Sequence, residues 1–156
     1  MELMNEFVIK GTPDTTTAQQ KGVRVIGRRV MFYKKPEVVQ AERWLWQDLL
    51  CYSPTEPYEG PLYVRVMWLF DKKSLAKKNA RTFRTERPDL DNMFKGLADV
   101  MSGMGFWKDD SQLVKIELTK AWSKEYPGLF FQIWKLTDED YTKMIDEWRD
   151  GHGYGF

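Results

Sequence analysis

The chain has 156 residues, of which 42% are hydrophobic and 30% are charged, and this composition excludes a disordered protein. The length predicts one globular domain over residues 1–156. The single cysteine, Cys51, excludes an internal disulfide and any zinc site made of several cysteines. Because the only histidine, His152, lies in a glycine-rich tail, carboxylates and lysines are expected to carry any chemistry.

The formal net charge is +1, but the charges are unevenly distributed along the chain. Residues 72–87 carry a net charge of +6, whereas residues 137–150 carry −4. This asymmetry predicts one face that binds an anionic partner. The first residues do not resemble a signal peptide, and no apolar run is long enough to span a bilayer. We therefore expect a soluble, cytoplasmic protein with no membrane partner.

In the first half of the chain we expect a strand at 6–10, a polar loop at 11–20 and a ragged hairpin or extended arm at 23–33. A helix at 37–50, a loop at 53–61 and a second strand at 62–70 are expected to follow. Pro36 favours a helix start, since proline fits the first helical turn. The clean alternation of apolar side chains in 62–70 predicts a strand that is buried on at least one face.

In the second half we expect a basic surface loop at 71–87, a helix at 90–104 and a strand at 112–121. The return strand of a hairpin at 129–136 and a last helix after 137 are expected to follow. Thr137 with Asp140 resembles a helix N-cap. This order of elements predicts an α+β fold, a mixed or antiparallel sheet with helices packed on one face. The apolar faces of the first and last helices could pack on the sheet or on a partner, and we favour the core for both.

The chemistry is expected in the stretch RPDLDNMFK, residues 87–95. Asp89 or Asp91 can open a helix that begins near Leu90, and Lys95 and Asp99 follow Asp91 at spacings of four and eight along one polar stripe. A second acidic pair, Asp109–Asp110, lies in the turn before the strand at 112. Because a helix of about 14 residues spans only about 20 Å, the returning turn is expected to bring Asp110 near Asp89 and Asp91.

Three carboxylates held together would repel one another unless a hard divalent cation neutralised them. Oxygen ligands suit Mg²⁺ or Mn²⁺, which can activate water for hydrolysis of a phosphodiester. Lys95 is placed to offset negative charge on the phosphate, and the basic segment could hold a phosphate backbone. The alternative is purely structural: a capping aspartate, an ordinary Asp91–Lys95 ion pair and a solvated charged face.

The stretch RPDLDNMFK, followed by Asp99 and by GFWKDDSQLVK at 105–115, resembles the signature of the RusA family of Holliday junction resolvases. This motif core spans 87–115, and Gly11-Thr12-Pro13 and Tyr33-Lys34-Lys35-Pro36 are similar to phage members. The resemblance implies a RusA-like fold and a homodimeric, Mg²⁺-dependent endonuclease, with Mn²⁺ as a substitute, that cuts four-way DNA junctions symmetrically in recombination and repair. It also implies a bacterial or phage-infected cell as the setting.

Carried over by position, the resemblance implies metal-binding acids at Asp89, Asp91 and Asp110, and a catalytic lysine at Lys95. The matching supporting residues are Asn92, Asp99, Asp109 and Gln112. In place of the compact basic run that many members have after Gly-x-Pro, this chain has TTTAQQ at 15–20, so Lys21, Arg24, Arg28 and Arg29 could substitute. We expect DNA contacts from the basic segment and the arm: Lys72, Lys73, Lys77, Lys78, Arg81, Arg84, Arg87, Arg28, Arg29, Lys34 and Lys35.

Two points stay open at this stage. Trp107, Phe32 and Tyr33 could wedge into an opened junction, although we favour packing roles for all three. The leading hypothesis of a junction-cutting enzyme competes with a nuclease of broader specificity for flaps, forks and replication intermediates, and with a non-catalytic DNA-binding module. A homodimer fits the first hypothesis, because a two-fold enzyme presents two sites to a junction that is itself nearly two-fold symmetric.

Overall fold

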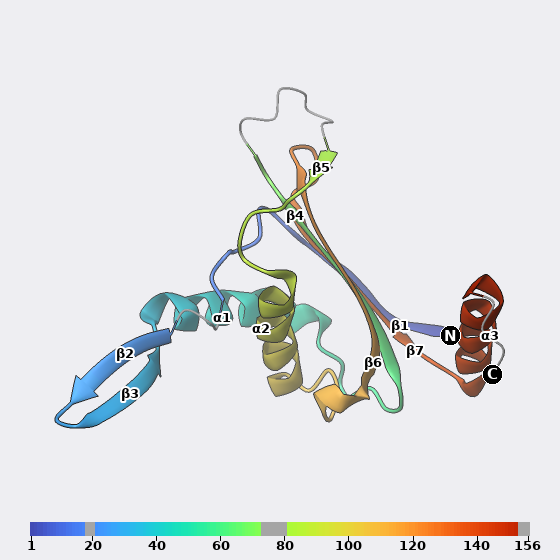
Figure 1. The fold of residues 1–156 in the computed structure, drawn as a ribbon, viewed down its shortest axis with the longest axis horizontal. Coiled ribbons are helices and arrows are strands. Elements are labelled where there is room, and N and C mark those ends of the chain that lie inside the picture. The colour runs from blue at the N-terminus through green and yellow to red at the C-terminus, as the bar shows by residue number, and fades with distance from the viewer. Residues whose placement is uncertain (18–20, 73–80, 153–156) are drawn as a thin grey trace.

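The computed structural model describes residues 1–17, 21–72 and 81–152, which form a five-stranded sheet, a separate two-stranded hairpin and three α-helices (Figure 1). The elements in chain order are β1 (Glu2–Lys10), β2 (Lys21–Ile26), β3 (Arg29–Lys34), α1 (Pro36–Leu49), η1 (Leu50–Tyr52), β4 (Leu62–Phe70), β5 (Arg81–Phe83), α2 (Leu90–Gly103), η2 (Asp110–Gln112), β6 (Leu113–Ser123), β7 (Gly128–Lys135) and α3 (Asp138–His152). The predicted α+β fold is confirmed. In the part of the chain that the structure describes, no helix is both long and apolar enough to cross a membrane.

The sheet is mixed and has the strand order β1-β7-β4-β6-β5. The predicted strand at 62–70 is confirmed as β4, and all five of its helix-facing side chains are buried: Leu62, Val64, Val66, Trp68 and Phe70. The expected hairpin of the two last strands is wrong, because β4 lies between them, parallel to β6 and antiparallel to β7. β4 is apolar on its helix-facing side and, apart from Arg65, on its other side as well, which suits the centre of the sheet, where it has a partner at each edge.

Helices α1 and α2 cover one face of the sheet, as predicted (Figure 1). α2 buries Met93, Leu97, Ala98 and Met101 against β4, while the expected Phe94 is half-buried at the edge of the core. After α2 the chain turns sharply, and Trp107 is buried with its indole N–H donating to Ser102 at 2.6 Å. The packing role expected for Trp107 is therefore confirmed.

The last helix does not pack on the sheet, so the core position favoured for it is wrong. The predicted cap of α3 is present, since the backbone N–H of Thr137 donates to Asp140 at 2.8 Å and that of Asp140 donates back to Thr137 at 3.3 Å. α3 nevertheless lies beyond the end of β7, away from α1 and α2 (Figure 1), with an exposed apolar stripe of Tyr141, Met144, Ile145 and Trp148. α1 and α2 occupy the helix-bearing face of the sheet instead.

The expected arm is confirmed as the hairpin of β2 and β3, which projects from the start of α1 (Figure 1). Its turn contains Gly27 at φ +62°, a conformation that glycine adopts without strain. Tyr33 covers Gly22 across the hairpin, but Phe32 is exposed. The packing role expected for Phe32 is therefore not met within one chain.

We expect Phe131→Ala to destabilise the fold by about 3–5 kcal/mol, because Phe131 is 1% exposed and stacks on Phe7 with ring centroids 5.1 Å apart. Urea unfolding followed by far-ultraviolet circular dichroism measures the change. Phe83→Ala is the control, since Phe83 is 77% exposed on the edge strand and its loss should change stability by less than about 0.5 kcal/mol. Equal losses in the two variants would contradict this assignment of the core.

Candidate active site

Asp89 is the N-cap residue of α2, but its side chain does not cap the helix. Its backbone is extended, with φ −72° and ψ 147°, and the side chain makes no capping hydrogen bond. The helix starts instead through the carbonyl oxygen of Asp89, which accepts from the N–H of Met93 at 3.1 Å. The structural alternative for Asp89, a capping aspartate, is therefore not realised, and its exposed carboxylate is available to a ligand.

The predicted polar stripe on α2 is also present. Asp91, Lys95 and Asp99 are all exposed, and Asp91 and Lys95 form no ion pair within 4 Å. Among the described residues, the carboxylates of Asp89 and Asp91 have no cationic partner at all. Two neighbouring carboxylates at one helix end, without a partner, are the kind of donor set that a hard cation would bind.

The segment that leads into Asp89 is fixed to the sheet by Lys120, on β6. Its ammonium group donates to the carbonyl oxygens of Glu86 at 2.8 Å and Pro88 at 2.7 Å. Arg84 adds a second tie, since it donates to the carbonyl oxygen of Arg87. Its guanidinium carbon lies 4.0 Å from the ring centroid of Phe70. These contacts hold the backbone immediately before the acidic pair.

Sequence reasoning did not single out Lys120, although a signal was available. Lys120 continues the alternation of Val114, Ile116 and Leu118, so it stands on the face of the strand that was expected to be apolar. A charged residue in that register indicates a partner inside the protein, and here the partners are backbone carbonyl groups.

The second acidic pair lies in a turn that is fixed by its own hydrogen bonds. Asp109 accepts from the N–H of Ser111 at 2.8 Å, and hydrogen bonds from Ser111 lower the pKa of this carboxyl below its usual value. The Gln112 carboxamide accepts from the N–H of Lys108 at 2.8 Å and donates to the carbonyl oxygens of Tyr58 and Gly60, each at 3.0 Å. Both predicted supporting residues therefore shape the turn that carries Asp110.

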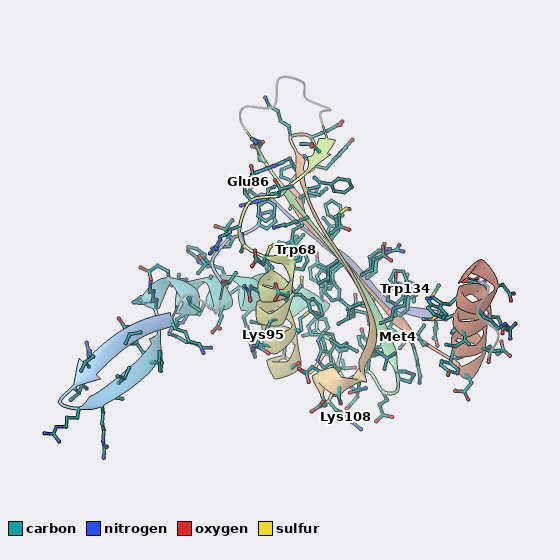
Figure 2. All side chains as sticks on the ribbon, viewed as in Figure 1. Met4, Trp68, Glu86, Lys95, Lys108 and Trp134 are labelled. Carbon is teal, nitrogen blue, oxygen red and sulfur yellow. The ribbon has the colours of Figure 1, made fainter. Side chains whose placement is uncertain are left out.

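The structure does not bring Asp110 to Asp89 and Asp91 within one chain, so that expectation is wrong. The turn follows the C-terminal end of α2, and a helix of 14 residues separates its ends by about 21 Å. Figure 2 shows this separation: Glu86 lies before the start of α2, Lys95 lies along the helix, and Lys108 lies beyond its end. No group of three acidic, histidine or cysteine side chains in the described residues could hold a metal ion. After this turn, β6 leads back to the segment before Asp89, where Lys120 donates to Pro88.

The residues expected to contact DNA differ in their surroundings. Arg28, Arg29, Lys35 and Arg87 are exposed, whereas Lys34 pairs with Glu42 at 2.8 Å. Arg84 is half-buried between two aromatic rings, so its contacts are structural. Lys72 lies 4.8 Å from the ring centroid of Trp122 and 3.6 Å from Glu86. Arg81 lies on β5, and the expected contacts at Lys73, Lys77 and Lys78 fall outside the described residues.

We expect Lys120→Met to loosen the segment before Asp89, because it removes two charge-assisted hydrogen bonds to backbone carbonyl groups. Cleavage after Glu86 by the glutamate-specific protease Glu-C should become at least about tenfold faster, since local opening exposes the backbone to the protease. Lys115→Met on the same strand is the control, because Lys115 lies over the ring of Tyr63 and contacts no part of this segment. An unchanged cleavage rate in Lys120→Met would contradict the proposed tie.

Comparison with known proteins identifies the family of this chain. The family model of endodeoxyribonuclease RusA matches residues 11–134, from the loop after β1 into β7. The chain is also 34% identical over 123 residues to the crossover junction endodeoxyribonuclease RusA of Lactococcus phage r1t, an alignment that covers 78% of this chain and 89% of that protein. The matched region contains both acidic pairs and Lys95, and α3 lies outside the family match. The chain therefore belongs to the RusA family of endodeoxyribonucleases, as its motif predicted, and it is a nuclease.

Proposed function

We propose that this protein is a Mg²⁺-dependent homodimer that resolves four-way DNA junctions by paired, symmetric hydrolysis of phosphodiesters during recombination and repair. The observation that carries the proposal is the pair of exposed carboxylates, Asp89 and Asp91, on a backbone segment that is tied to the sheet. The relative from Lactococcus phage r1t is named a crossover junction endodeoxyribonuclease, which supports four-way DNA as the substrate. We expect the activity in the cytoplasm of a bacterial or phage-infected cell.

The chemistry of the donor set fits a hard divalent cation. Asp89 and Asp91 offer carboxylate oxygens that engage no cation among the described side chains, and Mg²⁺ is commonly held by one or two carboxylates together with water. Such an ion, when bound, polarises the phosphate and activates a water molecule. Mn²⁺ is expected to substitute, and EDTA to abolish cleavage. The exposed ammonium group of Lys95, one turn further along α2, is then free to stabilise negative charge on the phosphate.

Asp110 can complete this site only from a second subunit, because α2 separates it from Asp91 within one chain. The surface beside Asp110 supports such an arrangement. Ile116 on β6 pairs with the buried Val64 of β4, yet Ile116 is 44% exposed, and Val114, at the irregularity in the pairing, is 60% exposed. An uncovered apolar patch next to a candidate ligand marks a surface for a partner. In a two-fold dimer, the acidic pair of each α2 would meet Asp110 of the other subunit, giving two equivalent sites.

Mixing two inactive variants tests where the ligands come from. Asp91→Asn and Asp110→Asn should each abolish nicking of a labelled four-way junction while junction binding persists. If the site is shared, a mixed dimer contains one site with both aspartates intact. Random mixing at equal amounts should then restore about a quarter of the intact sites, because half of the dimers are mixed and each has one working site of two. The measurement is the initial rate of nicking on a denaturing gel.

The same gel separates the alternatives. If both ligands belonged to one chain, the mixture would stay inactive, since no subunit would carry both aspartates. If either single variant cleaved at the wild-type rate, that residue would be removed from the site. Three-way, flap and fork substrates run alongside distinguish a junction resolvase from a nuclease of broader specificity. Cleavage that survives EDTA would contradict the metal requirement.

We expect Lys95→Ala to lower the rate of nicking by about 100-fold with little change in junction affinity, because a charge that acts on the reacting phosphate contributes mainly to the transition state. Single-turnover cleavage and gel-shift titration measure the two quantities separately. Lys143→Ala on α3 is the matched control, since Lys143 is also an exposed helical lysine but pairs with Glu147 at 3.9 Å. Equal losses of rate and affinity in Lys95→Ala would reassign Lys95 to DNA binding.

A further inference from the structure

The arm of β2 and β3 has two different faces. Because paired residues of an antiparallel hairpin point to the same side, Val23 with Phe32 and Val25 with Val30 form one apolar face. The opposite face carries Arg24 with Met31 and Ile26 with Arg29. All eight of these side chains are exposed.

Such an arm is not expected to be stable in water as it stands. A two-stranded hairpin gains too little from its own contacts, and an exposed apolar face is unfavourable. Each strand of the arm has six residues, so the arm extends about 20 Å from the start of α1. The apolar face therefore needs a surface beyond the chain to which it belongs.

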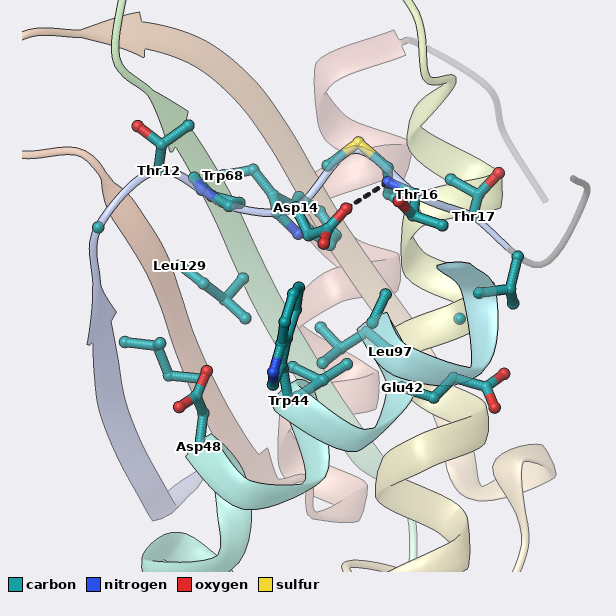
Figure 3. A pocket seen from close by; sticks show the side chains of 18 of the residues that line it. Thr12, Asp14, Thr16, Thr17, Glu42, Trp44, Asp48, Trp68, Leu97 and Leu129 are labelled. Carbon is teal, nitrogen blue, oxygen red and sulfur yellow. Dashed lines mark hydrogen bonds between the residues drawn. The ribbon is translucent and has the colours of Figure 1, made fainter. Parts of the chain in front are cut away.

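A surface that matches the apolar face of the arm lies along α1. A groove of about 450 Å³ runs between α1, the N-terminal half of α2 and the loop at 11–17 (Figure 3). Its apolar lining includes Pro13, Leu97 and Trp44, and Trp44 is 55% exposed and stands between α1 and the loop. Three carboxylates also line the groove: Asp14, Glu42 and Asp48.

We infer that the apolar face of the arm of one subunit docks into the groove of a second copy of this chain. Residues 21–35 contain six cations and no acid; Lys34 pairs with Glu42 of its own chain, so the other five cations complement the groove carboxylates of Asp14 and Asp48. The arm's turn carries Arg28, and Lys21 stands at the base of the apolar face. The carboxylates of Asp14 and Asp48 form no ion pair with any described residue of their own chain.

Charge disfavours the other occupants that are available. DNA would bring phosphates next to the three groove carboxylates, and the exposed α3 of a second copy would bring further acids. A docked arm leaves its opposite face, with Arg24 and Arg29, on the outside and free for DNA. Two-fold symmetry makes the exchange reciprocal, each arm entering the groove of the other subunit.

This inference rests on the dimer in the proposed function, and sedimentation velocity at several protein concentrations tests both. Val23→Asp on the apolar face should weaken dimerisation at least tenfold. Met31→Asp on the opposite face is the matched control, because the two side chains are 57% and 53% exposed, and it should leave dimerisation unchanged. A monomeric wild-type protein would overturn the dimer and the docking together. A wild-type dimer that Val23→Asp leaves intact would overturn the docking alone.

A crosslink identifies the docking surface directly. Phe32 is replaced by the photoreactive residue p-benzoylphenylalanine, and ¹⁵N-labelled and unlabelled proteins are mixed, irradiated and digested. We expect mixed-isotope peptide pairs that join position 32 to residues 11–17 or 41–48. Crosslinks to α3, to DNA when a junction is present, or only within one chain would overturn the proposal, as would a stable dimer that yields none.

Discussion

A helix of 14 residues keeps its ends about 21 Å apart, and α2 places one acidic pair near each end. The buried stripe of α2 packs on the central strand β4, so neither the helix nor its acidic end can shift without disturbing the core. The turn of Asp110 is fixed as firmly, through Gln112 and the loop at 58–60. Rigidity at both ends is what makes a second subunit necessary for a site that includes Asp110, since no local movement of a loop could close the gap.

The acidic pair also explains the contacts around it. Two carboxylates two residues apart at the start of α2 repel each other, and an untethered segment would relieve that repulsion by moving. Lys120 and Arg84 prevent the movement by binding carbonyl groups rather than the carboxylates themselves. The aspartates are thus positioned without being neutralised. Arg84 and Lys120 illustrate how a cation in a nuclease can serve the fold, and why a count of basic residues overstates the surface that is available to DNA.

Local patterns in the sequence predicted most of the elements and, through the motif around Asp89, the family. The alternation in β4, the apolar stripe of α2, the cap at Thr137 and the motif around Asp89 all depend on residues that are close in sequence. The predictions that were wrong depend on residues that are far apart in the sequence. The insertion of β4 between β6 and β7 depends on which strand is the most apolar, and the position of Asp110 depends on the direction in which α2 runs. The exposed face of α3 had the pattern of a buried element, because that pattern reports an apolar surface and not which chain covers it.

The two ends of the molecule carry opposite charge, and this separation follows the boundary of the family match. The basic arm lies within the matched residues 11–134, whereas α3, in the acidic segment 137–150, lies outside them (Figure 1). Acidic side chains repel a phosphate backbone over roughly a Debye length, about 8 Å at physiological salt. On the proposed function, α3 would make its own end of the sheet unfavourable for DNA, while the outer face of the arm would attract DNA. If the arm of one subunit docks on the other subunit, the cations on its outer face lie beside the partner's α2. The contact that joins the subunits would then also place positive charge near the carboxylates that would bind the metal ion.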